Sequence, residues 1–218
     1  MSTTRISIII DESGSMSGNK KSVIDGVNEF KNSLLSGVKE GNEVFADLIF
    51  FDASYNEEIE DVRFKFEGTP LAELPELGDG DYTPRGGTPL NDAIIEGIEK
   101  LAAQSSEEDK NMVIIMTDGM ENSSQNSTER VKEIVQAKES DGWNFVFLGA
   151  NIDSFSTGTQ YGMTAGKKMQ FNSTQVGTAS ALRSVAALAT NRANMDDEGY
   201  TSFAAAMSDT VEEEEINN

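Results

Sequence analysis

Three short apolar runs, each followed by a polar residue or a glycine, constrain the fold of this chain more than any other feature. They span Ile6–Ile10, Met112–Met116 and Phe145–Leu148. Near-continuous apolar strands of this length are typical of a parallel sheet covered on both faces, since each strand then buries the side chains of both its faces. We therefore predict that the three runs are buried, parallel strands.

Segments with helical periodicity lie between and beyond these runs. Apolar residues recur at steps of three and four over Val23–Val38, Leu90–Leu101, Val131–Val135 and Val176–Ala189, which gives each segment one apolar face. Alternating strands and helices of this kind form a mostly parallel sheet with a helical layer on either side. The predicted fold class is a three-layer α/β/α sandwich of Rossmann-like type.

One pair of predicted strands breaks this alternation. Val44–Phe51 and Ile59–Phe66 are expected to be strands joined by a turn, and in the second strand apolar residues alternate with Arg63 and Lys65. A hairpin partner with one solvated face belongs at the edge of the sheet, antiparallel to its neighbour. With a short strand at Lys168–Phe171, we expect six strands, one of them an antiparallel edge strand.

We expect one domain over residues 1–194, followed by an acidic tail over residues 195–218. The tail holds eight acidic residues and no basic one, including four consecutive glutamates at positions 212–215. Segments with so little apolar surface are typically flexible. Within the domain, residues 67–87 are expected to form a long loop, and a loop of this length is more often functional than idle.

The chain contains no histidine and no cysteine, which excludes whole classes of site. A Ser-His-Asp triad, a thiolate nucleophile and the usual zinc ligands all require one of these residues. The remaining protein ligands for a metal ion are oxygen atoms, which favour Mg²⁺, with Mn²⁺ or Ca²⁺ as alternatives.

The charge and hydropathy of the chain limit which partners it is expected to bind and where in the cell it is expected to be. Lys and Arg total 17 and Asp and Glu total 38, so the formal net charge is −21, which disfavours binding to the phosphates of nucleic acids. The apolar runs are far shorter than the roughly 20 residues that a membrane-spanning helix needs. The first ten residues also lack the apolar stretch of a secretion signal. We therefore expect a cytoplasmic protein with neither a nucleic-acid nor a membrane partner.

Polar motifs follow two of the predicted strands and precede one predicted helix. They are Asp11-Glu-Ser13-Gly-Ser15, Thr-Asp118-Gly and Gly-Gly-Thr88-Pro. In a sheet of this order the two strands are neighbours where the strand order reverses, and such sheets bind ligands there. Asp11 and Asp118 would then face each other, with Thr88 close by. Two carboxylates and three hydroxyls suit Mg²⁺, which prefers six oxygen ligands.

Each motif also has a purely structural interpretation. The first could be a polar loop, Thr88 could be an N-cap with Pro89 at the first helical position, and Asp118-Gly119 could be a turn. We favour an ion site because all three motifs occur together where such a site requires them. Two follow the carboxyl ends of predicted strands, and the third directly precedes a predicted helix.

Together the motifs resemble the metal-ion-dependent adhesion site (MIDAS) of the von Willebrand factor A domain, written Asp-x-Ser-x-Ser, then Thr, then Asp. The resemblance covers about residues 4–192, and all five positions match. It implies that Ser13, Ser15 and Thr88 coordinate the ion through hydroxyls, and that Asp11 and Asp118 hold it mainly through water. It also implies a protein partner whose acidic side chain completes the coordination. The compact, cysteine-free form is similar to stand-alone bacterial or phage members of the family.

Two other functions compete with a non-enzymatic, metal-dependent binding module. A bound Mg²⁺ could activate water in a hydrolase, but we find no Lys or Glu clearly placed as base, and by strand alternation Glu12 points away from Asp11. A chain with a net charge of −21 could also be an acidic decoy that mimics nucleic acid. A decoy would bind its partner in EDTA, a metal-dependent binder would not, and an enzyme would show turnover. The sequence does not assign an oligomeric state.

Overall fold

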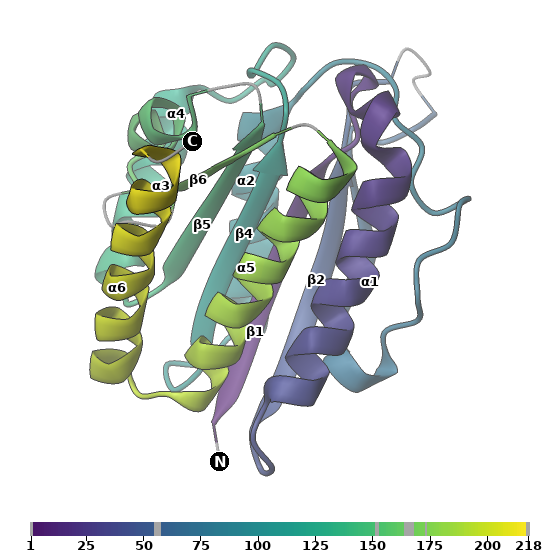
Figure 1. The fold of residues 1–218 in the computed structure, drawn as a ribbon. Coiled ribbons are helices and arrows are strands. Elements are labelled where there is room, and N and C mark those ends of the chain that lie inside the picture. Colours follow the sequence, from purple (N-terminus) through teal and green to yellow (C-terminus); the bar gives the residue numbers. More distant parts are fainter. Residues whose placement is uncertain (1, 55–57, 151–152, 164–167, 173, 217–218) are drawn as a thin grey trace.

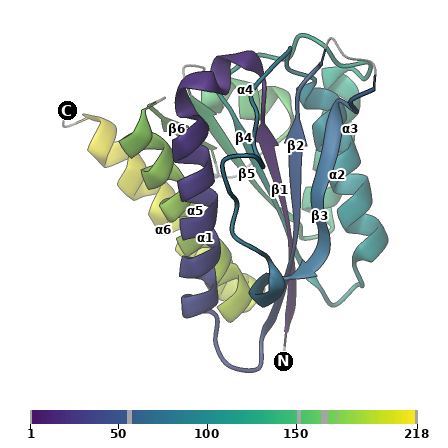
Figure 2. The same ribbon diagram turned by 90° about the vertical axis from the view of Figure 1, so that its right-hand side faces the viewer.

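The computed structural model describes residues 2–54, 58–150, 153–163, 168–172 and 174–216 of the chain. These residues form three layers, with a sheet in the middle and helices on both of its faces (Figure 1, Figure 2). The order of elements follows the predicted alternation and adds a helix near the carboxyl terminus. The predicted three-layer α/β/α fold class is confirmed.

The described residues form a six-stranded sheet with the spatial order β3-β2-β1-β4-β5-β6. The strands are β1 (Thr3–Asp11), β2 (Glu43–Phe51), β3 (Val62–Pro70), β4 (Lys110–Thr117), β5 (Asn144–Ala150) and β6 (Lys168–Phe171). Only the β2–β3 pair among them is antiparallel, and the other neighbours pair in parallel. The predicted antiparallel edge strand and the pairing of the first apolar run with the second are both confirmed.

Helices cover the two faces of the sheet separately, as Figure 2 shows. One layer contains α1 (Lys20–Gly37), α5 (Gln175–Asn194) and α6 (Asp197–Ile216), and the other contains α2 (Leu90–Gln104) and α3 (Thr128–Ser140). A shorter helix, α4 (Ser154–Gln160), contacts β5 and β6. In the described part of the chain, every helix is too short or too polar to cross a lipid bilayer.

Each central strand supplies side chains to two separate hydrophobic cores. In β1, Ile6, Ile8 and Ile10 belong to the core that contains residues of α1 and α5, whereas Ile9 belongs to the core that contains residues of α2 and α3. Successive side chains of a strand point to opposite faces of the sheet. Because helices bury both faces here, neighbouring positions are both apolar, and this explains the near-continuous apolar runs.

The edge strand lies further along the chain than the sequence predicts. The alternation of apolar residues predicts a strand over Ile59–Phe66, whereas β3 spans Val62–Pro70. Pairing continues as far as Pro70 with Phe45, because β2 extends far enough to offer a partner to residues that lack an apolar pattern. The start of the segment at 67–87, predicted as a loop, is therefore strand.

The segment 195–218, predicted as a flexible acidic tail, contains the helix α6 instead. Tyr200 is 2% exposed and belongs, with Ala204, to the core beneath α5. The guanidinium of Arg192 lies 5.3 Å from the centre of the Tyr200 ring and pairs with Asp197 at 2.8 Å. The start of α6 therefore packs on the domain, and the buried residues continue beyond position 194.

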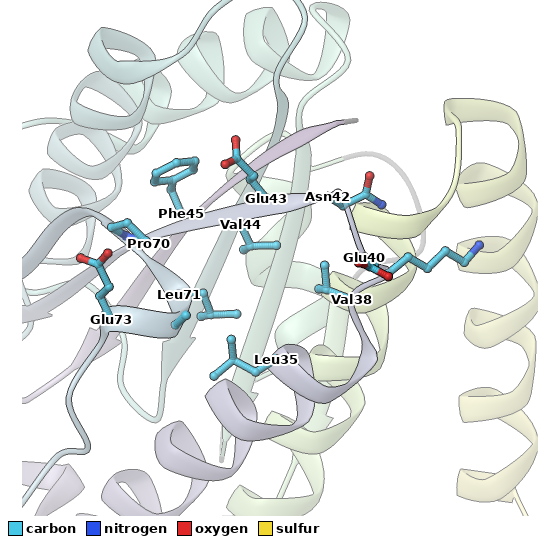
Figure 3. Close-up of a pocket in the computed structure, with 13 residues that line it drawn as sticks. Leu35, Val38, Glu40, Asn42, Glu43, Val44, Phe45, Pro70, Leu71 and Glu73 are labelled. Carbon is cyan, nitrogen blue, oxygen red and sulfur yellow. The ribbon is translucent and has the colours of Figure 1, made fainter.

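A groove of about 460 Å³ lies at the amino edge of the sheet, beside the end of α1 and the start of β2. Figure 3 shows Leu35, Val38, Val44 and Leu71 pointing toward one another in this groove. Leu35 is 38% exposed there. The groove therefore presents aliphatic side chains at the edge opposite to the carboxyl ends of the parallel strands.

Candidate metal centre

The polar motifs of the sequence lie at the carboxyl edge of the sheet. β1 ends at Asp11 and its neighbour β4 ends at Thr117, with Ile10 paired to Met116. The chain leaves β1 for α1 on one face of the sheet and leaves β4 for α3 on the other face. Open α/β sheets bind ligands at such a point, because the connections of the two strands lead away in opposite directions.

Oxygen atoms of the Asp11 and Thr88 loops converge on one point beside Gly119, which belongs to the third loop. A Cβ atom placed on Gly119 would lie 3.2 Å from Thr88 Oγ1, 3.7 Å from Ser15 Oγ and 3.8 Å from Asp11 Oδ2. The missing side chain of Gly119 leaves space at this point. The fold therefore brings one residue of each predicted motif to the same place.

Asp11 is fully buried at the end of β1. Its Oδ1 accepts a hydrogen bond from Ser13 N at 2.7 Å, and its Oδ2 accepts one from Thr117 Oγ1 at 2.6 Å. Burial raises the pKa of Asp11 to about 6, against the opposing effect of these hydrogen bonds, and the charge of Asp118 raises it further. Because burial outweighs the hydrogen bonds, a nearby cation would stabilise this carboxylate.

Ser13, Ser15 and Asp118 form a chain of hydrogen bonds beside Asp11. Ser13 Oγ and Ser15 Oγ share a hydrogen bond of 3.0 Å, and Ser15 Oγ donates to Asp118 Oδ1. Burial raises the pKa of Asp118 as well. With Thr88 close to Ser15 and Asp11 around Gly119, all five predicted site residues lie in one connected cluster.

Thr88 does not cap the helix that follows it. α2 begins at Leu90, after Pro89, and no side chain caps it from the Pro89 position. The loop after β4 binds the amides of the first turn instead, since Asn91 N donates to Glu121 Oε2 at 2.8 Å and Asp92 N donates to Ser124 Oγ at 3.1 Å. The N-cap alternative for Thr88 is therefore wrong, and its hydroxyl lies at the candidate centre.

The backbone around Thr88 is held from two sides. Thr88 N donates to Asn122 Oδ1 at 2.8 Å, and Asn122 N donates to Thr88 O at 3.2 Å. On the other side, Gly86 adopts a φ of +62°, and a Cβ atom there would lie 1.9 Å from Ala53 O. Only glycine permits so close an approach in this backbone conformation.

Several residues around the centre were not identified from the sequence. The buried Tyr82 hydroxyl donates to the backbone oxygen of Asp11, and burial raises the pKa of Tyr82 well above its usual range, so it is a neutral donor. Glu121 and Asn122 hold the start of α2 and the Thr88 backbone. The one sequence signal for Glu121 and Asn122 is that they lie within four residues of Asp118 in the same loop.

Glu12, the residue between two predicted ligands, is not solvated. Its side chain is buried, pairs with Arg63 and accepts a hydrogen bond from Thr83 N. Asp52 is also buried, and it pairs with the same arginine. A second group of charged residues therefore lies directly behind the candidate centre.

The donor set fits a hard divalent cation. It consists of three neutral hydroxyls and two carboxylates, and Mg²⁺ and Ca²⁺ bind oxygen ligands of these kinds. Among the residues that the structure describes, no group of three or more acidic side chains could hold a metal ion. An ion here would therefore depend on the hydroxyls, and the two carboxylates would supply the charge that attracts it.

Comparison with known proteins identifies the family of the fold. Residues 6–187 match the family model of the von Willebrand factor type A domain. No curated protein matches the sequence at a significant level.

Solved structures share the fold at low sequence identity. The pilus adhesin SpaC from Lactobacillus rhamnosus GG has a TM-score of 0.71 and 15% identity, over 88% of this chain and 31% of that one. Proximal thread matrix protein 1 from the mussel byssus, solved with zinc in its MIDAS motif, has a TM-score of 0.58 and 16% identity, over 85% of this chain and 47% of that one. The manganese-loaded TRAP protein of Plasmodium vivax has a TM-score of 0.53 and 18% identity, over 83% and 71%.

This chain spans about a third of the length of the adhesin and about half of the length of the mussel protein. The family model, in contrast, matches most of the chain, and the sheet has the predicted neighbouring pair β1 and β4 and the predicted antiparallel edge strand. The chain belongs to the von Willebrand factor type A domain family.

Proposed function

We propose that this domain is a non-enzymatic protein-binding module that depends on a divalent ion, with Mg²⁺ as the ion and Mn²⁺ or Ca²⁺ as substitutes. Ser13, Ser15 and Thr88 would hold the ion through their hydroxyls, and Asp11 and Asp118 would hold it mainly through water. An acidic side chain of a partner protein would complete the coordination. The observation that carries the proposal is the convergence of hydroxyl and carboxylate oxygens of the Asp11 and Thr88 loops beside Gly119, with Asp118 Oδ1 bonded to Ser15 Oγ.

The ligand chemistry gives a reason for an acidic partner. Hydroxyl ligands are neutral, so an ion held mostly by them keeps positive charge for a further anionic ligand. The net charge of the chain is −21, and a surface of this charge repels carboxylates elsewhere. A partner's acidic side chain would therefore be attracted at the ion and repelled around it, which would favour one orientation of the partner.

The structural relatives support a metal-dependent role. One is described with zinc in its MIDAS motif and another as manganese-loaded, and SpaC is a pilus adhesin. We extend divalent-ion binding to this chain because it shares their fold and because its candidate ligands lie together in the structure.

The surroundings of the centre favour binding over hydrolysis. The carboxylate of Glu12 is engaged by Arg63 and by Thr83 N, so it is poorly placed to take a proton from a water at the ion. The raised pKa of Tyr82 keeps that hydroxyl protonated. Cytoplasmic location and bacterial or phage origin remain predictions from the sequence.

Ion binding is tested by isothermal titration of chelator-treated protein with MgCl₂ and with MnCl₂. We expect one ion per chain, weaker binding in Thr88→Val and Ser13→Ala, and no binding in Asp11→Ala. Ser17→Ala is a control, because its exposed hydroxyl donates to the Gly14 backbone oxygen rather than to a predicted ligand. A parent protein that binds neither ion would refute the proposal.

Partner binding is tested by affinity purification in Mg²⁺ and in EDTA, followed by calorimetry with the purified partner. We expect binding in Mg²⁺, loss of binding in EDTA, and loss of binding to Thr88→Val. A partner held equally well in EDTA would indicate an acidic decoy instead. Turnover of a substrate in Mg²⁺ would indicate a hydrolase.

A further inference from the structure

Four charged side chains lie behind the candidate metal centre: Glu12, Asp52, Arg63 and Arg85. We propose that this group, the arginine clamp, positions the Thr88 hydroxyl and thereby sets the affinity of the centre for a divalent ion. The inference rests on the proposed function, because it concerns the same ion. It assigns these residues a positioning role, since none of them belongs to the predicted ligand set.

Asp52 is the centre of the clamp. It is completely buried at the end of β2, and its Oδ2 accepts a hydrogen bond from Arg85 Nε at 2.8 Å. Its Oδ1 pairs with Arg63 and also accepts a hydrogen bond from Arg85 Nη2 at 3.3 Å. Arg63 comes from β3 and Arg85 from the loop before α2. One buried carboxylate therefore ties an edge strand to the loop that carries Thr88.

Glu12 joins the clamp to the loop that carries the serine ligands. Its carboxylate pairs with Arg63 and accepts a hydrogen bond from Thr83 N, and its backbone oxygen accepts one from Arg85 N at 2.8 Å. Its backbone N–H donates to Phe51 O at 2.8 Å. The Ser13 loop, the end of β2 and the Thr88 loop are thus held together by the clamp residues.

A short path of backbone hydrogen bonds leads from the clamp to Thr88. Ala53, next to Asp52, forms a bridge with Gly87, in which Ala53 N donates to Gly87 O at 3.0 Å and Gly87 N donates to Ala53 O at 3.1 Å. Gly14 N donates to Gly86 O at 3.1 Å. Gly87 directly precedes Thr88. A shift of the loop at Arg85 would therefore move the Thr88 hydroxyl relative to the serine ligands.

The arginines also prevent competition for the ion. Two further carboxylates lie beside the centre, and an unpaired buried carboxylate is strongly unfavourable in a protein interior. Each arginine offers several N–H donors in a planar fork, and together they pair with both carboxylates. The clamp therefore directs these two charges toward the arginine side chains rather than toward the candidate centre.

Arg85→Met tests the clamp, because it removes both contacts of Arg85 to Asp52. Groups that orient metal ligands typically change metal affinity by about 10- to 100-fold when they are removed, so we expect the Kd for Mn²⁺ to rise at least about tenfold. Electron paramagnetic resonance of free Mn²⁺ measures this Kd at a temperature where circular dichroism shows each variant to be folded. Arg85→Lys, which keeps the charge but not the fork, should give an intermediate Kd.

Arg5→Met is the matched control. Arg5 is also a partly buried arginine paired with a carboxylate, Asp109, at 2.6 Å, but it lies at the amino end of β1. If loss of stability alone weakened ion binding, Arg5→Met would weaken it too. We expect a lower melting temperature in this variant and an unchanged Kd.

A measurement on the ion-free protein tests the clamp independently of the proposed function. Hydrogen exchange of the Gly87 amide should be faster in ion-free Arg85→Met than in the ion-free parent, and unchanged in Arg5→Met. A parent protein that binds no Mn²⁺ would overturn the proposed function, and with it the effect on ion affinity. A parent that binds Mn²⁺, with an Arg85→Met variant that binds it equally tightly or exchanges Gly87 equally slowly, would overturn the clamp alone.

Discussion

The two edges of the sheet use polar side chains in opposite ways. At the amino edge they bind backbone atoms of the domain itself: Lys110 Nζ donates to Met195 O at 2.7 Å, and Asn42 Nδ2 donates to Ala193 O at 3.0 Å. These bonds satisfy carbonyls at the end of α5, which have no partner within the helix. At the carboxyl edge, oxygen atoms of Asp11 and Thr88 converge beside Gly119 instead.

This difference shows which edge is suited to a charged ligand. The polar groups at the amino edge are already used by the fold, and the groove there presents aliphatic side chains. The carboxylates of Asp11 and Asp118 have raised pKa values, because burial is not offset by hydrogen bonds. Buried negative charge is stabilised when a cation pairs with it. We therefore expect changes at the amino side to affect stability, and changes at the carboxyl edge to affect ion binding.

The largest effect on stability is expected from Tyr200→Ala, at the start of α6. Tyr200 is buried in the core and lies beneath the Arg192 guanidinium, and deletion of a buried aromatic side chain costs about 3–5 kcal/mol of unfolding free energy. Urea denaturation measures the loss, and the Kd for Mn²⁺ should not change. Tyr200→Phe, which keeps the ring, is the control. A Tyr200→Ala protein as stable as the parent would show that α6 does not dock in solution.

Asp11→Ala should remove the stabilisation by the ion without unfolding the protein. A ligand at 100 times its Kd adds about 2.7 kcal/mol to the unfolding free energy, and we expect this gain to disappear in thermal melts with Mg²⁺. The ion-free variant should stay folded, because the raised pKa of Asp11 means that its buried charge does not stabilise the fold. Asp109→Ala, at the amino side, should melt earlier but keep its response to Mg²⁺. An unchanged response in Asp11→Ala would place the ion elsewhere.

Ion affinity should fall in acid. The pKa of Asp11 is about 6, so below this pH a proton competes with the ion, and the Kd for Mn²⁺ should rise about tenfold between pH 7 and pH 5. In the ion-free protein, the unfolding free energy should change with pH in the direction opposite to the ion affinity. The folded state binds more protons than the unfolded state between pH 3.8, the ordinary pKa of Asp, and about 6, so the unfolding free energy should decrease as the pH rises through this range.

The control for this pH dependence is Asp11→Asn, which cannot titrate. In this variant the part of the stability change that arises from Asp11 should vanish between pH 4 and pH 6. A titration of Mn²⁺ with the same Kd at both pH values in the parent would contradict the assignment of Asp11 to the ion site.

The smallest effect is expected from Leu35→Ser, in the groove at the amino edge. Leu35 is more than a third exposed, and surface substitutions usually change stability by less than about 0.5 kcal/mol. Neither urea denaturation nor the Kd for Mn²⁺ should differ much from the parent. Leu34→Ala, one position away and fully buried, should cost about 2–5 kcal/mol. A strong effect of Leu35→Ser on ion binding would mean that the two edges are coupled.

The candidate ligands could be predicted from the sequence because they follow strands with an unambiguous pattern. Ile6–Ile10 and Met112–Met116 are buried on both faces, so each forms a near-continuous apolar run. The residues after each run must lie at the carboxyl edge of a parallel sheet. Because the two strands are neighbours, Asp11 and Asp118 lie close together irrespective of the conformation of the connecting loops.

The sequence did not reveal the contacts that hold the site or the end of the chain. Arg63 in an alternating strand has the pattern of an ordinary surface charge, yet it pairs with two buried carboxylates. Tyr200 lies in an acidic segment typical of a flexible tail, yet it packs in the core. In both cases the residue stands in a charged segment, so the local sequence gives no sign of its contact with another element.

By itself, the sequence determined the alternation of strands and helices, the antiparallel edge strand and the five candidate ligands, because hydrophobic periodicity and the order of motifs are local properties of a chain. Only the tertiary structure decided that Glu121 rather than Thr88 binds an amide at the start of α2, that Arg63 and Arg85 meet at Asp52, and that α6 packs on α5. Each of these outcomes depends on groups from different elements that come within hydrogen-bond or van der Waals distance. That proximity is created by the packing of the sheet and its helices, and no local pattern of residues records it.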